Sequence, residues 1–124
     1  MNGFTLDTGA LIGLERRNQR MLQFMRVARE DRLAVTVPVN VIAEWWRRRT
    51  DVREMILSAV TVEPMDVELA RRVGEALAAV RGATLVDATV MVSAARRGDT
   101  VLSADLDDLT RLGPRFPSVR VMRV

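Results

Sequence analysis

The chain has 124 residues, of which 48% are hydrophobic and 28% charged, with a formal net charge of +3. These values describe one globular domain with a substantial core. It contains no cysteine and no histidine, and all 19 basic residues are arginine. Disulfides, thiolate zinc sites, histidine-based acid–base catalysis, Schiff-base lysines and the lysine of a Walker phosphate loop are therefore excluded. Carboxylates, hydroxyls and arginines remain for any chemistry.

The first residues, MNGFTLD, lack the basic segment, apolar stretch and small-residue cleavage site of a signal peptide. No apolar run approaches the roughly 20 residues that a membrane-spanning helix needs. We therefore expect a cytoplasmic protein with no membrane partner. The positive net charge is compatible with a nucleic-acid partner but is weak support by itself.

Short apolar runs of strand length alternate with segments of helical periodicity along the whole chain. The predicted strands are Phe4–Leu6, Leu33–Val37, Val60–Val62, Thr100–Ser103 and Val119–Met122. The predicted helices are Leu11–Arg16, Gln19–Arg29, Val39–Arg49, Val52–Ala59, a segment from its cap at Asp66 to Val80, and Val86–Arg97. Pro38 stands where a proline opens a helix, and Gly98 stands where a glycine ends one.

This alternation predicts the α/β class, in a single domain spanning residues 1–124. We expect a central, mainly parallel sheet of four to five strands flanked by helices. Open sheets of this kind bind ligands at the carboxyl ends of their strands.

Four acids occupy or border that edge of the predicted sheet. Asp7 follows the first strand and Asp105 lies just past the fourth, while Glu44 sits in an apolar helix and Asp87 opens the last long helix. Each has a simpler structural explanation. Asp7 is placed to cap a helix, Thr84 and Asp87 have the spacing of a capping box, and Asp105 suits a turn.

Glu44 could instead pair with Arg48 one turn later, which is worth about 0.2–0.5 kcal/mol. Taken singly, each structural explanation is about as good as a functional one. Taken together they explain less, because independent structural acids have no reason to gather at one edge. Carboxylates crowded together repel and raise one another's pKa unless a cation neutralises them.

Oxygen ligands of this type select a hard divalent cation, with Mg²⁺ expected and Mn²⁺ as its natural substitute. Such an ion lowers the pKa of a bound water and stabilises charge on a phosphoryl oxygen. An arginine-rich surface would neutralise a phosphodiester backbone, which favours a nuclease over a small-molecule phosphatase.

The other charged and aromatic clusters have ordinary structural interpretations. Arginines 16, 17 and 20 and the run Arg47–Arg49 could follow RNA phosphates, although solvated helix faces explain such residues more often. Arg96 and Arg97 stand at a predicted helix end, where cations complement the helix dipole. Trp45 and Trp46 are expected in the core, with an interface as the alternative for one of them.

The order LDTGALI, VPVNVIAEWWR, LVDATVMVSAA and VLSADLDDL resembles a PIN-domain ribonuclease of the VapC type, the toxin of a bacterial type II toxin–antitoxin pair. The resemblance spans essentially the whole chain. It places Asp7, Glu44, Asp87 and Asp105 at the acidic positions of the family, with Thr8 and Ser103 as accompanying hydroxyls. It implies Mg²⁺- or Mn²⁺-dependent endoribonuclease activity, with tRNA or rRNA as the expected substrate. A homodimer and inhibition by a cognate antitoxin are further implications.

The roles that follow are hypotheses. Asp7 and Asp87 are the best direct metal ligands, Asp105 completes the site directly or through water, and Glu44 positions the attacking water or a second ion. Asp107 and Asp108 are expected in the first turn of a short helix, where they suit its dipole, and Asp108 could border the site.

Two other classes of protein share some of these features. A response-regulator receiver has similar size and strand-end acids, but its characteristic lysine is absent from this chain. The stronger alternative is a catalytically silent PIN-like module that binds RNA or a protein partner. Metal binding separates both acidic-site interpretations from a purely structural one, and cleavage separates the enzyme from the module.

Overall fold

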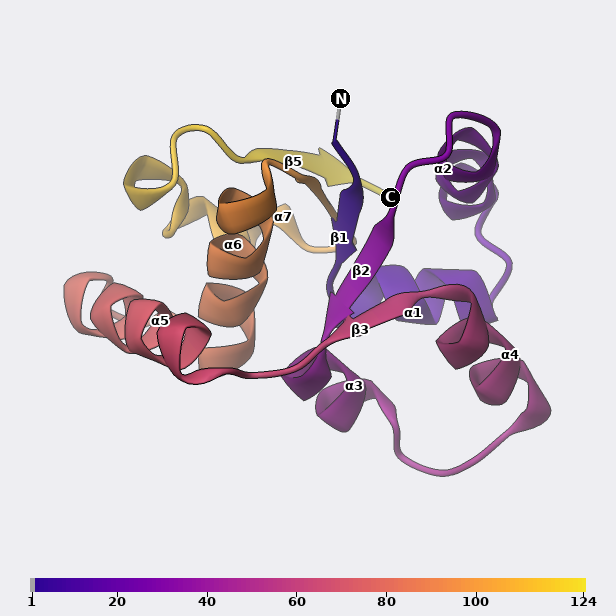
Figure 1. Cartoon of the computed structure of the whole chain (residues 1–124), viewed down its shortest axis with the longest axis horizontal. Helices are drawn as coiled ribbons and strands as arrows, with labels where there is room; N and C mark the ends of the chain where they lie inside the picture. Colours follow the sequence, from indigo (N-terminus) through magenta and orange to yellow (C-terminus); the bar gives the residue numbers. More distant parts are fainter. Residues whose placement is uncertain (1) are drawn as a thin grey trace.

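The structure, a computed structural model, describes residues 2–124 and is built around one parallel sheet (Figure 1). The strand order is β3-β2-β1-β4-β5, and every neighbouring pair is parallel. The strands are β1 (Phe4–Leu6), β2 (Val35–Pro38), β3 (Thr61–Glu63), β4 (Thr100–Ser103) and β5 (Arg120–Arg123). The prediction of a mainly parallel α/β sheet is confirmed.

Helices cover both faces of this sheet. In Figure 1, α5 and α6 lie on one side of the strands, and α1, α2 and α4 lie on the other. The helices are α1 (Thr8–Glu15), α2 (Gln19–Glu30), α3 (Val39–Trp45), α4 (Asp51–Ala59), α5 (Val67–Ala79), α6 (Leu85–Arg97), α7 (Leu106–Thr110) and the short 3₁₀ helix η1 (Gly113–Arg115).

The central strand β1 shows why the strands appear in the sequence as short, continuous buried runs. All three of its residues are buried. Phe4 packs edge-to-face on Phe24 of α2, with ring centroids 5.5 Å apart, whereas the Thr5 hydroxyl meets Arg97 of α6. Thr5 is accommodated in a strand covered on both faces because its hydroxyl is hydrogen-bonded to both Arg97 and Asp99.

The outer elements differ in their ends from the sequence prediction. Leu33, predicted in β2, instead donates its backbone N–H to Ala28 and closes the end of α2. The third and fifth strands begin one residue later than predicted, at Thr61 and Arg120. Edge strands carry a weaker apolar signal, so their ends are harder to place.

The largest difference is the length of α3, which ends at Trp45 rather than at Arg49. The backbone leaves the helical region at Trp46, with ψ at 83°, and Arg47 donates from Nε to the Glu44 carbonyl oxygen, one of the last carbonyls of the helix. The Thr50 hydroxyl then accepts the Arg53 N–H at 3.1 Å and starts α4 as a separate helix.

The early end of α3 separates the two tryptophans. Trp45 is buried, and its indole N–H donates to Glu15 of α1. Trp46 is half-buried and stands edge-to-face against Trp45, with ring centroids 5.8 Å apart. The prediction of core packing is confirmed for Trp45, and Trp46 packs against the outside of the core.

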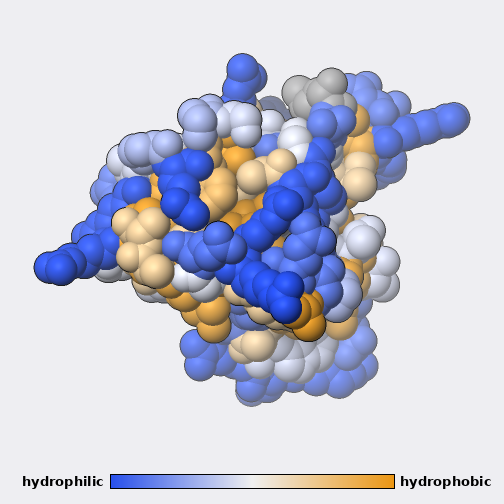
Figure 2. Space-filling model, turned by 60° about the vertical axis from the view of Figure 1, so that its left-hand side comes forward, coloured by the Kyte–Doolittle hydropathy of each residue, from blue (hydrophilic) through white to orange (hydrophobic). Residues whose placement is uncertain are grey.

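The surface carries only scattered apolar side chains. The face turned toward the viewer in Figure 2, which carries α5 and α6, is mostly hydrophilic with apolar groups showing between the polar ones. Val67 and Leu85, the first residues of these helices, are exposed. Within residues 2–124, no helix is both long and apolar enough to cross a membrane.

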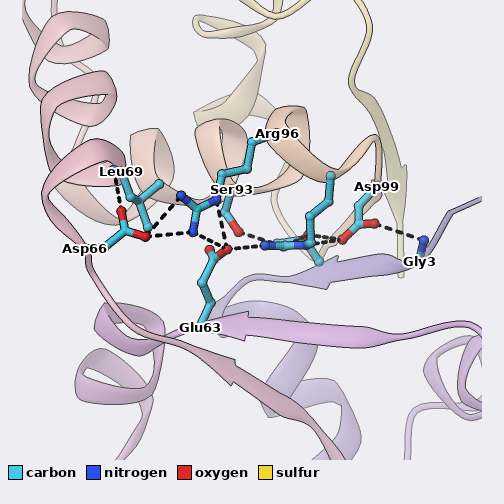
Figure 3. Close-up of polar contacts among 9 residues, drawn as sticks. Gly3, Glu63, Asp66, Leu69, Ser93, Arg96 and Asp99 are labelled. Atoms are coloured by element: carbon cyan, nitrogen blue, oxygen red, sulfur yellow. Dashed lines mark hydrogen bonds and ion pairs between the residues drawn. The ribbon is translucent and has the colours of Figure 1, made fainter.

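Arg96 and Arg97 form a network of ion pairs in addition to standing in the last turn of α6, and Figure 3 shows Arg96 with Glu63 and Asp66 in this network. Both guanidinium groups donate to the Oε2 atom of Glu63, the last residue of β3, with Arg96 Nη2 at 2.8 Å. Arg97 also binds Asp99 at 2.9 Å and the hydroxyls of Thr5 and Ser93. The network ties the edge strand β3 and the central strand β1 to the end of α6.

We expect Glu63→Gln to lower the free energy of unfolding by about 3 kcal/mol, because removing one partner of a buried ion pair strands the other charges. This is the lower end of the usual range, since the two arginine side chains are 23% and 26% exposed and can rehydrate. Urea unfolding measures the change. The matched control is Glu68→Gln, which breaks the exposed pair with Arg72 and should cost less than about 0.5 kcal/mol. Equal losses in both variants would contradict the proposed importance of the network.

Candidate active site

Asp7 is held at the carboxyl end of β1 by the start of α1. Its backbone is extended, and its side chain accepts the Ala10 N–H at 2.9 Å as the N-cap of the helix. The side chain is buried, and this burial raises the pKa of Asp7. The Ser103 hydroxyl and the Ala10 amide lower it, whereas the negative charges of Asp87 and Asp105 raise it further. The capping role expected from the sequence is therefore real, and it coexists with a destabilised charge.

Asp87 lies in the first turn of α6, where its backbone N–H donates to the Thr84 hydroxyl at 3.1 Å. Burial raises the pKa of Asp87, the Thr84 side chain lowers it, and the charges of Asp108, Glu44 and Asp105 raise it. The residue is thus both part of a helix cap and a carboxylate surrounded by like charges.

Glu44 reaches the same region from α3. The Thr8 hydroxyl, from the first residue of α1, donates to its Oε1 atom. Because α3 ends at Trp45, the alternative explanation of Glu44 as an ion-pair partner of Arg48 does not hold within the described residues. The guanidinium of Arg47 instead donates from Nε to the Glu44 carbonyl oxygen at 3.1 Å.

Asp105 follows β4 and caps α7, accepting the Asp107 N–H at 3.1 Å. The fully buried Ser103 fixes this turn: its hydroxyl accepts the Asp105 N–H and donates to the Asp105 carbonyl, both at 3.0 Å. Asp107 and Asp108 stand in the first turn of α7, as predicted.

Asp108 contributes more to the site than its sequence position indicated. Of the neighbouring charges that act on Asp87, it is the one that raises the pKa most, ahead of Glu44 and Asp105. Asp105 and Asp108 are three residues apart at the start of one helix, a spacing that places side chains on the same face. That spacing was the available signal in the sequence.

The structure therefore brings all four predicted acids into one electrostatic cluster from four separate segments. None of the four pairs with an arginine within residues 2–124, although arginines neutralise acids elsewhere in the molecule. Their oxygen-only donor set fits a hard divalent cation.

The carboxylates of the cluster stand too far apart, as placed, for three of them to bind one ion. Among the described residues, no three acidic side chains stand in an arrangement that could hold one ion. The carboxylates of Asp7, Glu44 and Asp105 bind protein donors instead: the Ala10 amide, the Thr8 hydroxyl and the Asp107 amide. Closing around an ion requires side-chain movement.

Comparison with known proteins identifies the fold. No family model and no curated protein matches the sequence. Among solved structures, the chain is similar to VapBC2 from Rickettsia felis bound to a promoter DNA fragment, with a TM-score of 0.73, 10% identity and 98% of each chain covered. The fold is PIN-like.

Two further structures agree. VapBC-5 of the VapBC toxin–antitoxin family, from Mycobacterium tuberculosis, matches with a TM-score of 0.61, 22% identity and all of both chains covered. FitAcB from Neisseria gonorrhoeae matches with a TM-score of 0.61, 17% identity and 96% of each chain covered. The resemblance seen in the sequence is confirmed at the level of the PIN-like fold.

We expect Asp7→Asn to unfold at a higher temperature than the parent protein at pH 7 in EDTA. A raised pKa means that ionising Asp7 destabilises the folded state, and asparagine keeps the cap on Ala10 without the charge. The advantage should shrink as the pH falls toward the ordinary carboxyl value of 3.8, where the parent carboxyl group also becomes neutral. Thermal unfolding followed by circular dichroism measures it.

Asp66→Asn is the control of opposite sign. The Leu69 amide and Arg96 hold the pKa of Asp66 below its ordinary value, so its charge favours the folded state. This variant should be less stable than the parent protein at pH 7. Our account of the cluster would be wrong if Asp7→Asn also lost stability under these conditions.

Proposed function

We propose that the protein is a Mg²⁺-dependent endoribonuclease that acts as the toxin of a toxin–antitoxin pair. The carrying observation is that Asp7, Glu44, Asp87 and Asp105 converge without an arginine partner among the described residues. Repulsion among these carboxylates destabilises the folded state, and a bound cation would relieve that repulsion, which gives the cluster a functional explanation. The PIN-like fold it shares with toxin–antitoxin structures supports the same function.

The roles follow from the contacts. Asp7 and Asp87 hold the Mg²⁺ ion, or Mn²⁺ in its place, because their pKa values are raised and cation binding relieves that cost. Asp105 completes the site directly or through a water, and Ser103 fixes its backbone. Glu44, oriented by the Thr8 hydroxyl, positions the attacking water or a second ion. When bound, the ion supplies a more acidic water and stabilises charge on the phosphoryl oxygen.

The substrate we propose is RNA, with tRNA or rRNA as the targets. Arg47 and Arg48 directly follow the helix that carries Glu44, and both are exposed. They form no ion pair within the described residues, whereas Arg49 pairs with Asp51 and Glu54. Two exposed guanidinium groups without a carboxylate partner, close in sequence to Glu44, are suited to bind RNA phosphates.

We also propose two protein partners, one from the similarity to solved structures and one from the family resemblance of the sequence. A cognate antitoxin is expected because VapBC-5, which matches over its whole length, belongs to a toxin–antitoxin family. A homodimer is expected from the family resemblance of the sequence, with partly exposed Trp46 as one candidate interface residue.

A catalytically silent PIN-like module that binds RNA or protein is the second candidate. The observation in its favour is the open spacing of the acids, which hold no ion-binding arrangement among residues 2–124. It differs from the enzyme in one measurable respect, namely cleavage.

The test is incubation of purified protein with pooled tRNA and rRNA in Mg²⁺, Mn²⁺ or EDTA. We expect discrete cuts that require the metal. We expect Asp87→Asn to reduce the rate at least about 100-fold, because a weaker metal site no longer supplies the acidified water whose proton transfer speeds the reaction. Arg26→Gln changes an exposed arginine of α2, a helix that carries none of the four acids, so this surface control should cut normally. RNA binding without cleavage by the parent protein would favour the silent module.

A further inference from the structure

Two consecutive hydrogen bonds join α3, which carries Glu44, to α6, which carries Asp87. Asn40, in the first turn of α3, donates from Nδ2 to the Thr89 hydroxyl oxygen at 2.8 Å. Thr89, completely buried in α6, in turn donates to the Leu85 carbonyl oxygen at 2.7 Å. The chain of bonds thus begins on α3 and ends in the first turn of α6.

Its two ends lie beside the acids. Asn40 precedes Glu44 by four residues, so the two side chains share one face of α3. Leu85 stands two residues before Asp87 in the first turn of α6. A shift of α3 against α6 at the Asn40–Thr89 bond would therefore also move the backbone segments that carry Glu44 and Asp87.

The amide of Asn40 is not explained by stability. Its Oδ1 atom is buried and has no hydrogen-bond partner in the structure. An unsatisfied buried carbonyl costs about 1–3 kcal/mol, which an apolar residue at this position would avoid. The neighbouring positions Val39, Val41 and Ile42 are all apolar, so the helix accepts such side chains.

A positioning role does explain it. The negative charges of Glu44 and Asp87 repel each other, which favours separation of α3 and α6. A buried hydrogen bond opposes this separation because it is directional, whereas an apolar contact allows one helix to shift along the other. Residues that orient metal ligands from behind commonly change metal affinity without touching the ion.

We propose that Asn40 and Thr89 are positioning residues that fix the spacing of Glu44 and Asp87 for divalent-cation binding, an inference that rests on the proposed function of the acidic cluster. Neither residue contacts the reacting groups. Sequence reasoning passed over both, because an asparagine and a threonine inside apolar helices carry no motif.

Asn40→Leu separates positioning from stability. Leucine has a similar size and removes both the bond to Thr89 and the unsatisfied oxygen, so in EDTA the melting temperature should stay equal or rise. The dissociation constant for Mn²⁺, measured from free Mn²⁺ by electron paramagnetic resonance, should rise about tenfold, the smaller of the usual effects of such residues. A purely structural residue would instead lower the melting temperature and leave Mn²⁺ affinity unchanged, which overturns the inference.

Thr89 offers a matched pair of variants. Thr89→Val keeps the shape but loses the hydroxyl and should weaken Mn²⁺ binding about tenfold, whereas Thr89→Ser keeps the hydroxyl and should restore it. Ser93→Ala is the control, because it removes another buried hydroxyl of α6 that binds Arg97 rather than Asn40. It should lower stability without changing Mn²⁺ affinity.

The outcomes also separate this inference from the function it rests on. A parent protein that binds no Mn²⁺ overturns the metal site and the inference together. A parent protein that binds Mn²⁺, with the same affinity in Asn40→Leu and Thr89→Val, overturns the positioning role alone and leaves the proposed enzyme intact.

Discussion

Repulsion among carboxylates at the carboxyl edge of the sheet is the constraint on which the structure of the site depends. The parallel order of the strands brings Asp7 and Asp105 to one edge, and helix α3, which follows β2, and the start of α6, which precedes β4, add Glu44 and Asp87. Burial and mutual repulsion hold the pKa of both Asp7 and Asp87 above their ordinary values. The fold tolerates this cost because Ala10, Ser103 and other nearby donors offset part of it without removing the charge.

The two ends of helix α6 treat buried carboxylates differently. At its C-terminal end, Arg96 and Arg97 neutralise Glu63, and Arg97 also binds Asp99. At its N-terminal end, Asp87 has no cationic partner in the part of the chain that the structure describes. The same helix is therefore anchored to the sheet at one end and left negatively charged at the other. This contrast is difficult to explain for a merely structural cluster, and it is expected for a site that takes its cation from solution.

The sequence was sufficient for the strand–helix alternation and for the four acids, because buried parallel strands and strand-end carboxylates leave local signals. The predicted end of α3 was wrong, because helical periodicity continues to Arg49 whereas the backbone leaves the helix at Trp46 and Thr50 starts α4 as a separate helix. Arg96 and Arg97 were assigned to a helix dipole because their partner Glu63 is more than thirty residues away. Asn40 and Thr89 were missed for the same reason, since their bond joins residues 49 positions apart.

A crystal structure grown with Mn²⁺ and measured at the manganese absorption edge tests the central claim most directly. We predict one strong anomalous peak between Asp7 and Asp87, about 2.0–2.3 Å from a carboxylate oxygen of each, the range expected for small hard divalent cations. The Asp87→Asn crystal should lose that peak while the fold is retained. Crystals that bind Mn²⁺ elsewhere, or show no peak at the acids with the cation in millimolar excess, would contradict the account.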